Sequence, residues 1–239
     1  MSRRLAVRRL PGHVPYVEAM RLQSALVQRR RAKSSPDTLL LLEHAPVFTL
    51  GRLQASAKNV LASPEAIAAA GASVVQSDRG GNVTFHGPGQ LVAYPILDLK
   101  DHRRDLRWFV GALEEAMIAT AAAYGVRAAA GGAGETGVWV EDRKIGAIGV
   151  RVQRWFSSHG VALNADVDLD YFGMIVPCGL EQRPKVTSLS REARGFDAVR
   201  VDDVAPRFVD AFASAFDVDP YEQQEQAWEA EVRRDPRVL

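Results

Sequence analysis

Apolar positions along the chain follow two periods, one typical of helices and one typical of strands. Residues at helical spacing share an apolar face in three long segments. These segments predict helices over residues 16–32, 106–124 and 206–216. A short fourth helix is predicted to begin at Pro64, with Ser63 as its N-cap, and to end at Gly71.

Short apolar runs bounded by glycine, proline or charged turns predict strands. They cover residues 39–42, 47–50, 74–75 and 159–164. A hairpin is predicted to join residues 137–140 to residues 144–152 through the charged turn Glu141-Asp142-Arg143. Because the predicted helices and strands neither alternate strictly nor consist of strands alone, the pattern favours one α+β domain. We place it at residues 1–220 and expect residues 221–239, rich in Glu and Arg, to form a helical or frayed tail.

The composition is that of an ordinary globular protein, with 47% hydrophobic and 25% charged residues among 239. A net charge of +1 gives no electrostatic reason to expect nucleic acid or membrane lipid as the main partner. No signal peptide and no apolar run of about 20 residues is visible, so the cytoplasm is the expected location. The arginines at 29–31 and 103–104 are expected on solvated helix faces, with docking of an acidic protein as the alternative.

Cys178 is the only cysteine, and it lies in the sequence Val176-Pro177-Cys178-Gly179. One thiol cannot form an internal disulfide or an all-cysteine metal cage, so it is either an inert core residue or a nucleophile. The flanking proline and glycine favour a sharp, exposed turn. Downstream, the hydroxyls of Thr187 and Ser188 could cap a turn or donate to a developing oxyanion.

Lys144 follows the acidic turn of the predicted hairpin, where a lysine is usually solvated. The alternative is that it points into a site beside Cys178. An ammonium group there would favour the thiolate of a cysteine, whose free pKa is about 8.5. It could also exchange protons with a leaving thiolate or an incoming amine.

Residues 79–90 contain four glycines and a proline, with arginine, threonine, histidine and glutamine between them. The simplest interpretation is a hairpin connection between residues 83–84 and 91–94. The polar side chains among glycines instead favour the wall of a ligand site, because glycine lets backbone approach a ligand closely. The segment is no phosphate loop, since it lacks the Gly-Lys-Ser/Thr ending and no helix follows directly.

The five histidines differ in their surroundings. His86 and His159 are each followed by glycine and are the functional candidates, and either could form a couple with the cysteine. His44 is expected to brace a strand end, whereas His13 and His102 are expected to be incidental. No pair of histidine, cysteine or acidic residues has zinc-ligand spacing, so no metal is expected.

Taken together, these blocks closely resemble the octanoyl-[acyl-carrier-protein]:protein N-octanoyltransferases, also called lipoyl(octanoyl) transferases. The hallmark is Arg79-Gly80-Gly81-x-Val83-Thr84-x-His86-Gly87-Pro88-Gly89-Gln90, continued by Leu91-Val92-x-Tyr94-Pro95. Further matching blocks are residues 42–44, 49–52, 136–140, 143–149, 159–164, 175–179 and 186–189. Each block is weak alone, but the ordered set, over about residues 38–190, is highly specific.

The resemblance implies a fold, a reaction and a site. The fold is that of the biotin/lipoate protein ligases, a single domain with a mixed β-sheet and flanking helices. The reaction transfers an octanoyl group from octanoyl-acyl carrier protein to a lysine of lipoyl domains, as the first step of endogenous protein lipoylation. The acceptors would be the lipoyl domains of 2-oxoacid dehydrogenase complexes and the glycine cleavage H protein. No cofactor, metal, nucleic acid or membrane is implied.

By the same resemblance, Cys178 attacks the acyl thioester, and Lys144 lowers the pKa of that thiol and handles protons. His159 is a supporting candidate. Phe85 stands at a position where a tyrosine would add a hydroxyl, so we assign it no catalytic role. The segments expected to bind the acyl chain contain Arg79, Gly80, Gly81, Asn82, Val83, Thr84, Phe85, His86, Ala147, Ile148, Gly149, Gly160, Val161 and Ala162.

The chemistry of an acyl transfer agrees with these residues. Exchange between thioesters is nearly balanced and needs no ATP, and an eight-carbon chain could gain on the order of 5 kcal/mol by burying its methylenes. Two other functions stay open. An ATP-dependent lipoate-protein ligase on the same fold would use the lysine but needs no cysteine. A non-enzymatic module that binds acylated carrier proteins would leave both residues without a role.

Overall fold

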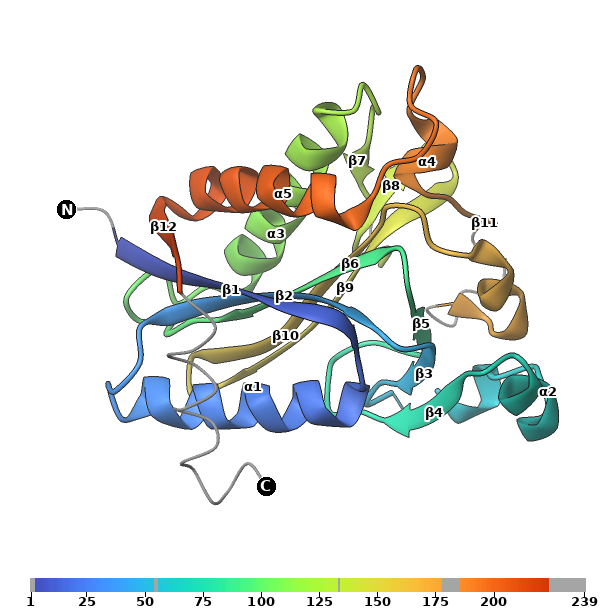
Figure 1. Ribbon diagram of the computed structural model, residues 1–239. Helices are drawn as coiled ribbons and strands as arrows, with labels where there is room; N and C mark the ends of the chain where they lie inside the picture. Colours follow the sequence, from blue (N-terminus) through green and yellow to red (C-terminus); the bar gives the residue numbers. More distant parts are fainter. Residues whose placement is uncertain (1–2, 54–55, 133, 178–184, 224–239) are drawn as a thin grey trace.

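The structure is a computed structural model that describes residues 3–53, 56–132, 134–177 and 185–223. Within this part of the chain, nine strands form one mixed sheet (Figure 1). The strands are, in spatial order, β12 (Val218–Glu222), β1 (Arg3–Val14), β2 (Asp37–His44), β6 (Gln90–Ile96), β10 (Phe156–Asn164), β9 (Arg143–Gln153), β8 (Val138–Val140) and β7 (Ala129–Ala130), with β11 (Lys185–Val186) parallel to β9.

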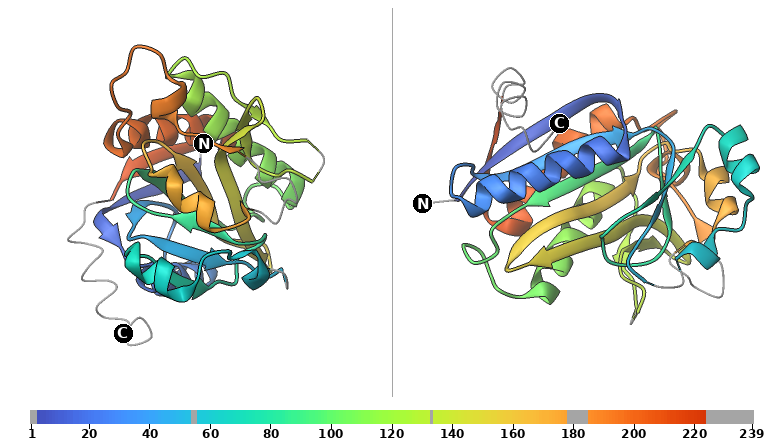
Figure 2. Two further views of the ribbon diagram at one scale, coloured as in Figure 1. Left: turned by 90° about the vertical axis from the view of Figure 1, so that its right-hand side faces the viewer. Right: turned by 90° about the horizontal axis from the view of Figure 1, so that it is seen from below.

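Helices cover both faces of this sheet. Helix α1 (Tyr16–Arg31) runs along one face, and α3 (Leu106–Ala122) and α5 (Val201–Phe216) pack together on the other (Figures 1 and 2). The larger core lies beneath α3 and α5, where Phe109, Phe208 and Phe212 are fully buried against the sheet. The fold is therefore α+β, as the sequence predicted.

A second, three-stranded sheet lies beside one end of the first. It contains β4 (Ser73–Gln76), β3 (Val47–Leu50) and β5 (Thr84–His86), and the short helices nearby are α2 (Pro64–Ala69), η1 (Ala57–Asn59) and η2 (Leu169–Met174). Ser63 caps α2 as predicted, because its hydroxyl accepts from the N–H of Ala66. The ring of Phe85 is buried here, stacked on Tyr171 with centroids 4.3 Å apart.

The hairpin interpretation of residues 83–94 is wrong. Strand β5 pairs with β3 in the small sheet, whereas β6 pairs with β2 and β10 in the large one. The chain changes sheets at Gly89, whose φ is +81° and whose carbonyl accepts from the N–H groups of Ala165 and Asp166. A Cβ at Gly89 would lie 2.4 Å from the carbonyl oxygen of Asp166, so only glycine fits this crossing.

Several elements differ from the sequence-based expectations. Strand β1 was not predicted, and it contains His13. Helix α5 begins at Val201 and contains Pro206, which had been expected to start it. Strand β12 extends two residues beyond the predicted domain boundary at residue 220, and residues 224–239 of the expected tail lie outside the described residues.

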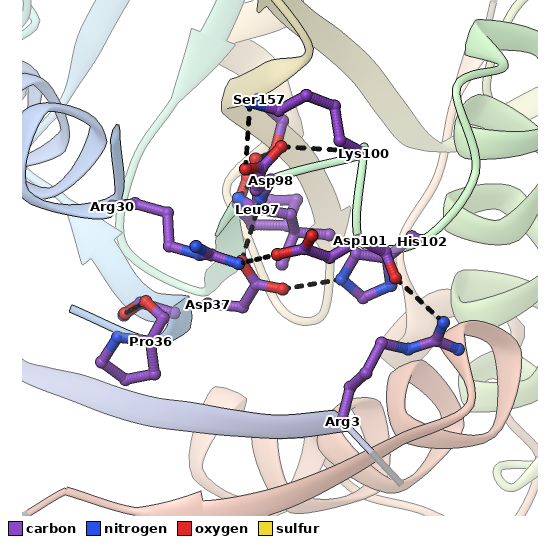
Figure 3. A network of polar contacts seen from close by, with 12 residues as sticks. Arg3, Arg30, Pro36, Asp37, Leu97, Asp98, Lys100, Asp101, His102 and Ser157 are labelled. Carbon is purple, nitrogen blue, oxygen red and sulfur yellow. Dashed lines mark hydrogen bonds and ion pairs between the residues drawn. The ribbon is translucent and has the colours of Figure 1, made fainter. Parts of the chain in front are cut away.

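A buried polar network fastens the end of α1 to the sheet (Figure 3). The carboxylate of Asp37 accepts from Arg30 Nε at 2.6 Å, from His102 Nε2 at 2.7 Å and from the N–H of Asp98 at 2.9 Å. Arg30 also reaches Asp101 at 2.6 Å, and its side chain is only 12% exposed. The expected solvation of all three arginines at 29–31 is thus wrong for Arg30, and His102 is not incidental.

The second arginine pair does not lie on a helix. Arg103 and Arg104 precede Asp105, whose carboxylate caps α3 by accepting from the N–H groups of Arg107 and Trp108. The exposed Arg103 pairs with Asp105 at 3.2 Å. The local reason is that a capping aspartate must sit outside the first helical turn, which leaves its preceding arginines in the connecting loop.

Candidate active site

A cavity of about 180 Å³ lies between β9 and β10 of the large sheet and the segment that leads into β5. An engineered cavity of about 150 Å³ holds benzene, so this one suits a ligand with a comparable or slightly larger apolar part. The predicted residues that line it are Arg79, Gly81, Asn82, Val83, Thr84, His86, Lys144, Ala147, Ile148, Gly149, His159, Gly160, Val161 and Ala162.

Two predicted residues do not line this cavity. Gly80 lies behind the wall, where its N–H donates to the carbonyl of Val150 at 3.0 Å. Phe85 belongs to the core of the small sheet, with Phe48, Tyr171 and Phe172 around its ring. Strand alternation explains this placement, because Thr84 and His86 turn toward the cavity and the residue between them turns away.

The cavity follows the direction of the paired strands β9 and β10. Ala147 pairs with Ala162, Ile148 with Val161 and Gly149 with Gly160. Lys144 lies at one end of this stretch of β9, and Gly149 is five residues further along, about 17 Å at the usual strand rise. The cavity is therefore elongated, with Lys144 at one end and His159 at the other.

Lys144 is buried and points into the cavity, so the solvated interpretation is wrong. The residue is 6% exposed, and its Nζ donates to the carbonyl of Thr136 at 2.9 Å. The same Nζ lies 5.1 Å from the ring centroid of Trp139, within cation–π range. Gly137 makes room for it: its φ is +128°, and a Cβ there would lie 2.8 Å from Lys144 Cε.

Cys178 lies outside the described residues, but both flanks of its segment are described. On the N-terminal side, the N–H of Val176 donates to the carbonyl of Asn59 at 2.7 Å. On the C-terminal side, Val186 pairs with Lys144 in register, and the N–H of Thr187 donates to the carbonyl of Lys144 at 3.0 Å. The C-terminal flank of the cysteine segment, at Val186 and Thr187, therefore lies beside the buried lysine.

The two downstream hydroxyl residues directly precede a short helix, α4 (Leu189–Glu192). Ser188 is its N-cap residue, although its side chain makes no capping hydrogen bond. The hydroxyl of Thr187 donates to Glu192 Oε1 at 2.6 Å, and Glu192 also binds Arg143. Because a hydroxyl has one proton to donate, Thr187 stabilises the turn here rather than facing an oxyanion.

A chain of hydrogen bonds connects His86 to the lysine end of the cavity. His86 Nδ1 lies 2.7 Å from Gln90 Oε1, and Gln90 Nε2 donates to Asn164 Oδ1 at 2.9 Å. Asn164 Nδ2 in turn donates to the carbonyl of Thr187. Since Gln90 Oε1 can only accept, we assign the proton of His86 to Nδ1. Burial, with nearby His44 and Arg79, holds the pKa of His86 well below its usual value, so the ring is neutral at pH 7.

Three polar aromatic residues behind and beside His86 were not assigned to the site from the sequence. Tyr16 stacks on His86 at 5.9 Å and hydrogen-bonds Ser77 at 2.8 Å, while Tyr94 lies 2.7 Å from His44 Nε2. His44 Nδ1 donates to the carbonyl of Val14, which braces the ends of β1 and β2 as predicted. Burial lowers the pKa of His44 to about 4, so its neutral Nε2 accepts from the Tyr94 hydroxyl.

Arg79 holds the glycine segment in place from within. The side chain is buried, and its guanidinium donates to the carbonyl of Thr49 at 2.7 Å, to the Thr49 hydroxyl and to the carbonyl of Gly80 at 2.9 Å. Gly51 permits this packing, because a Cβ there would lie 2.1 Å from the carbonyl oxygen of Gly81. The charge of Arg79 therefore serves the wall of the cavity rather than a bound ligand's carboxylate.

Across the described part of the chain, no three histidine, cysteine or acidic residues are grouped so that they could hold a metal ion. The same residues include no helix with the length and apolarity that crossing a membrane requires.

The fold and the cavity define a catalytic domain of the lipoyl protein ligase A/B class. Residues 15–213 match the family model described as the lipoyl protein ligase A/B catalytic domain, and the chain belongs to that family. A bipartite lipoate protein ligase from Thermoplasma acidophilum superposes with a TM-score of 0.68 at 17% identity, over 100% of this chain and 94% of that one. A lipoate-protein ligase A bound with ATP superposes with a TM-score of 0.73 at 16% identity, over 100% of this chain and 97% of that one.

Within this family the chain groups with the octanoyltransferases. It is 49% identical over 209 residues to the octanoyltransferase of Gloeobacter violaceus, covering 87% of this chain and 89% of that protein. It is 51% identical over 189 residues to the octanoyltransferase of Rubrobacter xylanophilus, covering 79% of this chain and 84% of that protein. The protein is therefore an acyltransferase, and the biotin/lipoate ligase-like fold predicted from its sequence is confirmed.

Proposed function

We propose that the protein transfers an octanoyl group from octanoyl-acyl carrier protein to a lysine of lipoyl domains, through a thioester on Cys178. The observation that carries the proposal is Lys144, a buried lysine at one end of an elongated cavity, with the C-terminal flank of the cysteine segment paired to it. Octanoyltransferase relatives at up to 51% identity supply the choice of acyl group.

The transfer takes place in two balanced steps. In the first, the thiolate of Cys178 attacks the thioester carbonyl; a new C–S bond forms, the bond to the carrier's thiol breaks, and that thiol leaves with a proton. In the second, the amine of the acceptor lysine attacks the same carbonyl, the amide C–N bond forms and Cys178 is released. The ammonium of Lys144 stabilises the attacking thiolate and gives its proton to the departing carrier sulfur in the first step. In the second step the resulting neutral amine of Lys144 takes a proton from the attacking lysine amine, which restores the ammonium beside the released Cys178 thiolate.

The cavity wall supports an apolar chain as cargo. Along the paired strands Ala147 carries only a methyl group and Gly149 and Gly160 carry no side chain, while Ile148 and Val161 contribute apolar side chains. The aromatic side chains nearby have hydrogen-bond partners behind the wall, as Tyr94 has in His44 and His86 in Gln90. A chain of methylenes can lie against such a surface without leaving polar groups unpaired.

The partners of the proposed reaction are octanoyl-acyl carrier protein and lipoyl domains, those of the 2-oxoacid dehydrogenase complexes and the glycine cleavage H protein. We place the reaction in the cytoplasm and expect no cofactor. The catalytic domain at residues 1–220 and the tail at residues 221–239 stay predictions.

Intact-protein mass spectrometry tests the proposal directly. The protein is mixed with octanoyl-acyl carrier protein in the absence of ATP, beside the Cys178→Ala and Lys144→Ala variants. We expect a mass gain of one octanoyl group in the wild type, none in Cys178→Ala, and slower formation in Lys144→Ala. Adding a lipoyl domain should move the group to that domain.

The alternatives give different results. Modification of the lipoyl domain that needs ATP and free lipoate, with no adduct on the enzyme, would identify a ligase. Tight binding of the octanoylated carrier without release of its acyl group would identify a binding module. Either result would refute the transfer through Cys178.

A further inference from the structure

Two cavities meet at His159. The first is the elongated cavity described above, of about 180 Å³. The second, of about 270 Å³, lies between α1 and the far ends of β9 and β10. Met20, Val27 and Phe156 line it together with a larger number of polar and charged side chains, among them Gln28, Arg31 and Asp78. Among the residues that the structure describes, His159 is the one that lines both. The imidazole ring of His159 therefore lies between the elongated cavity and the second cavity.

His159 is fixed in this position from two sides. The backbone N–H of His159 donates to Gln23 Oε1 on α1 at 2.7 Å, and its ring Nε2 donates to Asp78 Oδ1 at 2.6 Å. Asp78 also pairs with Arg151 on β9. The residue has a φ of +55°, which a side chain with a Cβ adopts only when its surroundings impose it. The contacts of Gln23 and Asp78 supply that constraint.

The strand pairing explains why a histidine can turn away from the sheet here. Strand β10 pairs with β6 only from Val161 onward, where Val161 faces Ala93. Pro95, two residues after Ala93, has no N–H with which to continue this pairing. Gly160, between His159 and Val161, has no room for a Cβ, since one would lie 2.0 Å from the carbonyl oxygen of Ala93. The backbone N–H of His159 is thus left to α1, and its ring closes the end of the cavity.

We propose that His159, held by Asp78 and Gln23, limits the length of the acyl chain that the enzyme accepts, and that the second cavity is an extension of the same tunnel that the ring keeps closed. The inference rests on the proposed function. An octanoyl chain that starts at the lysine end runs toward His159. Methylenes beyond that point must displace a ring hydrogen-bonded to a carboxylate, and they would bring apolar groups against Asp78 and Arg151.

The test compares acyl carrier proteins loaded with octanoyl and dodecanoyl groups as donors for one lipoyl domain. In His159→Gly, which accepts the positive φ, the ratio of kcat/KM for dodecanoyl over octanoyl should rise by about tenfold or more above the wild-type ratio. The change should be in KM for the longer donor, since the reacting end is untouched. Failure of the wild type to transfer octanoyl would refute the proposed function itself, whereas an unchanged ratio in an active, folded His159→Gly would refute only this inference.

Two control variants separate the role of His159 from general damage to the fold. His102→Ala also removes a buried histidine bound to an aspartate, at 2.7 Å, but outside both cavities, and it should leave the ratio at the wild-type value. Val27→Phe fills the second cavity from α1, so adding it to His159→Gly should restore the preference for octanoyl. If His159→Gly does not fold, Asp78→Ala releases the ring instead, and a ratio equal to that of the wild type would overturn the inference.

Discussion

Replacing Asp37 with asparagine tests how strongly the network of Figure 3 fastens α1 to the sheet. In the wild type, one carboxylate accepts from Arg30, His102 and the N–H of Asp98, and only 5% of Asp37 is exposed. Asparagine keeps the size and one acceptor. It removes the charge that faces Arg30 and turns an NH₂ group toward the N–H of His102.

The size of the expected loss in the free energy of unfolding follows from the burial of this ion pair. Removing one partner of a buried ion pair costs 3–5 kcal/mol in general; Arg30 keeps Asp101, so we expect about 3 kcal/mol in the free energy of unfolding. For a chain of this size that corresponds to a fall in Tm of about 6–12 °C. Octanoyl transfer measured well below Tm should stay close to that of the wild type, because the residues of the network do not line the cavity that contains Lys144 and His159.

Thermal unfolding, followed by circular dichroism, measures the effect. The matched control is Asp217→Asn, which alters the exposed pair between Arg3 and Asp217 and should leave Tm within about 2 °C. If Asp37→Asn lowered Tm no more than this control does, the network would not stabilise the fold as its geometry indicates.

The pH dependence gives a second check on Asp37. Burial alone would raise the pKa of this carboxyl, but the hydrogen bonds from His102 and Arg30 outweigh it and the pKa is lowered on folding. Its contribution to stability is therefore complete above the unfolded pKa of about 3.9 and is lost as the pH falls through the lower folded value. The difference in stability between wild type and Asp37→Asn should narrow below pH 4, and a constant difference would contradict this account.

Three further substitutions test the packing around the site. Gly160→Ala places a Cβ 2.0 Å from the carbonyl oxygen of Ala93, so urea denaturation should show a loss of about 3 kcal/mol or more. Gly111→Ala lies inside α3 with nothing within 4 Å, so the same assay should show a gain of about 0.5–1 kcal/mol. Tyr94→Phe leaves the buried Nε2 of His44 without its donor and should cost about 1–3 kcal/mol, with KM for the octanoyl donor nearly unchanged.

The sequence predicted correctly those elements whose conformation depends on residues close to one another in the chain. The apolar face of α3, the Ser63 cap of α2 and the charged turn between β8 and β9 are each encoded within a few residues, and the structure contains all three. Strand β1 escaped prediction because its pairing partners β2 and β12 are distant in the chain. In addition, Arg8 interrupts its apolar run, although in the structure it is buried and donates to Gln223 Oε1.

The sequence indicated which residues line the cavity better than it indicated how the segments that carry them fold. The glycines and histidine of residues 79–90 marked a ligand wall, yet nothing in that segment shows that β5 and β6 belong to different sheets. That outcome depends on Glu43, whose carboxylate accepts from the N–H of Gly89 at 2.7 Å, and on the residues after β10. Tyr16 gave no signal, because an aromatic at the start of an amphipathic helix is an ordinary core residue.

The residue types around the cavity suggest a more polar surface than the structure presents. Tyr16, His86 and Tyr94 line the cavity and His44 lies behind them, but each uses a polar atom on a protein partner. Burial keeps the pKa of both imidazoles low and raises that of both phenols, so the four rings are uncharged at neutral pH. Their contribution to the cavity is therefore aromatic surface held rigidly in place. This surface suits the acyl chain of the proposed reaction, and it depends on hydrogen bonds between residues up to 61 positions apart that no local motif encodes.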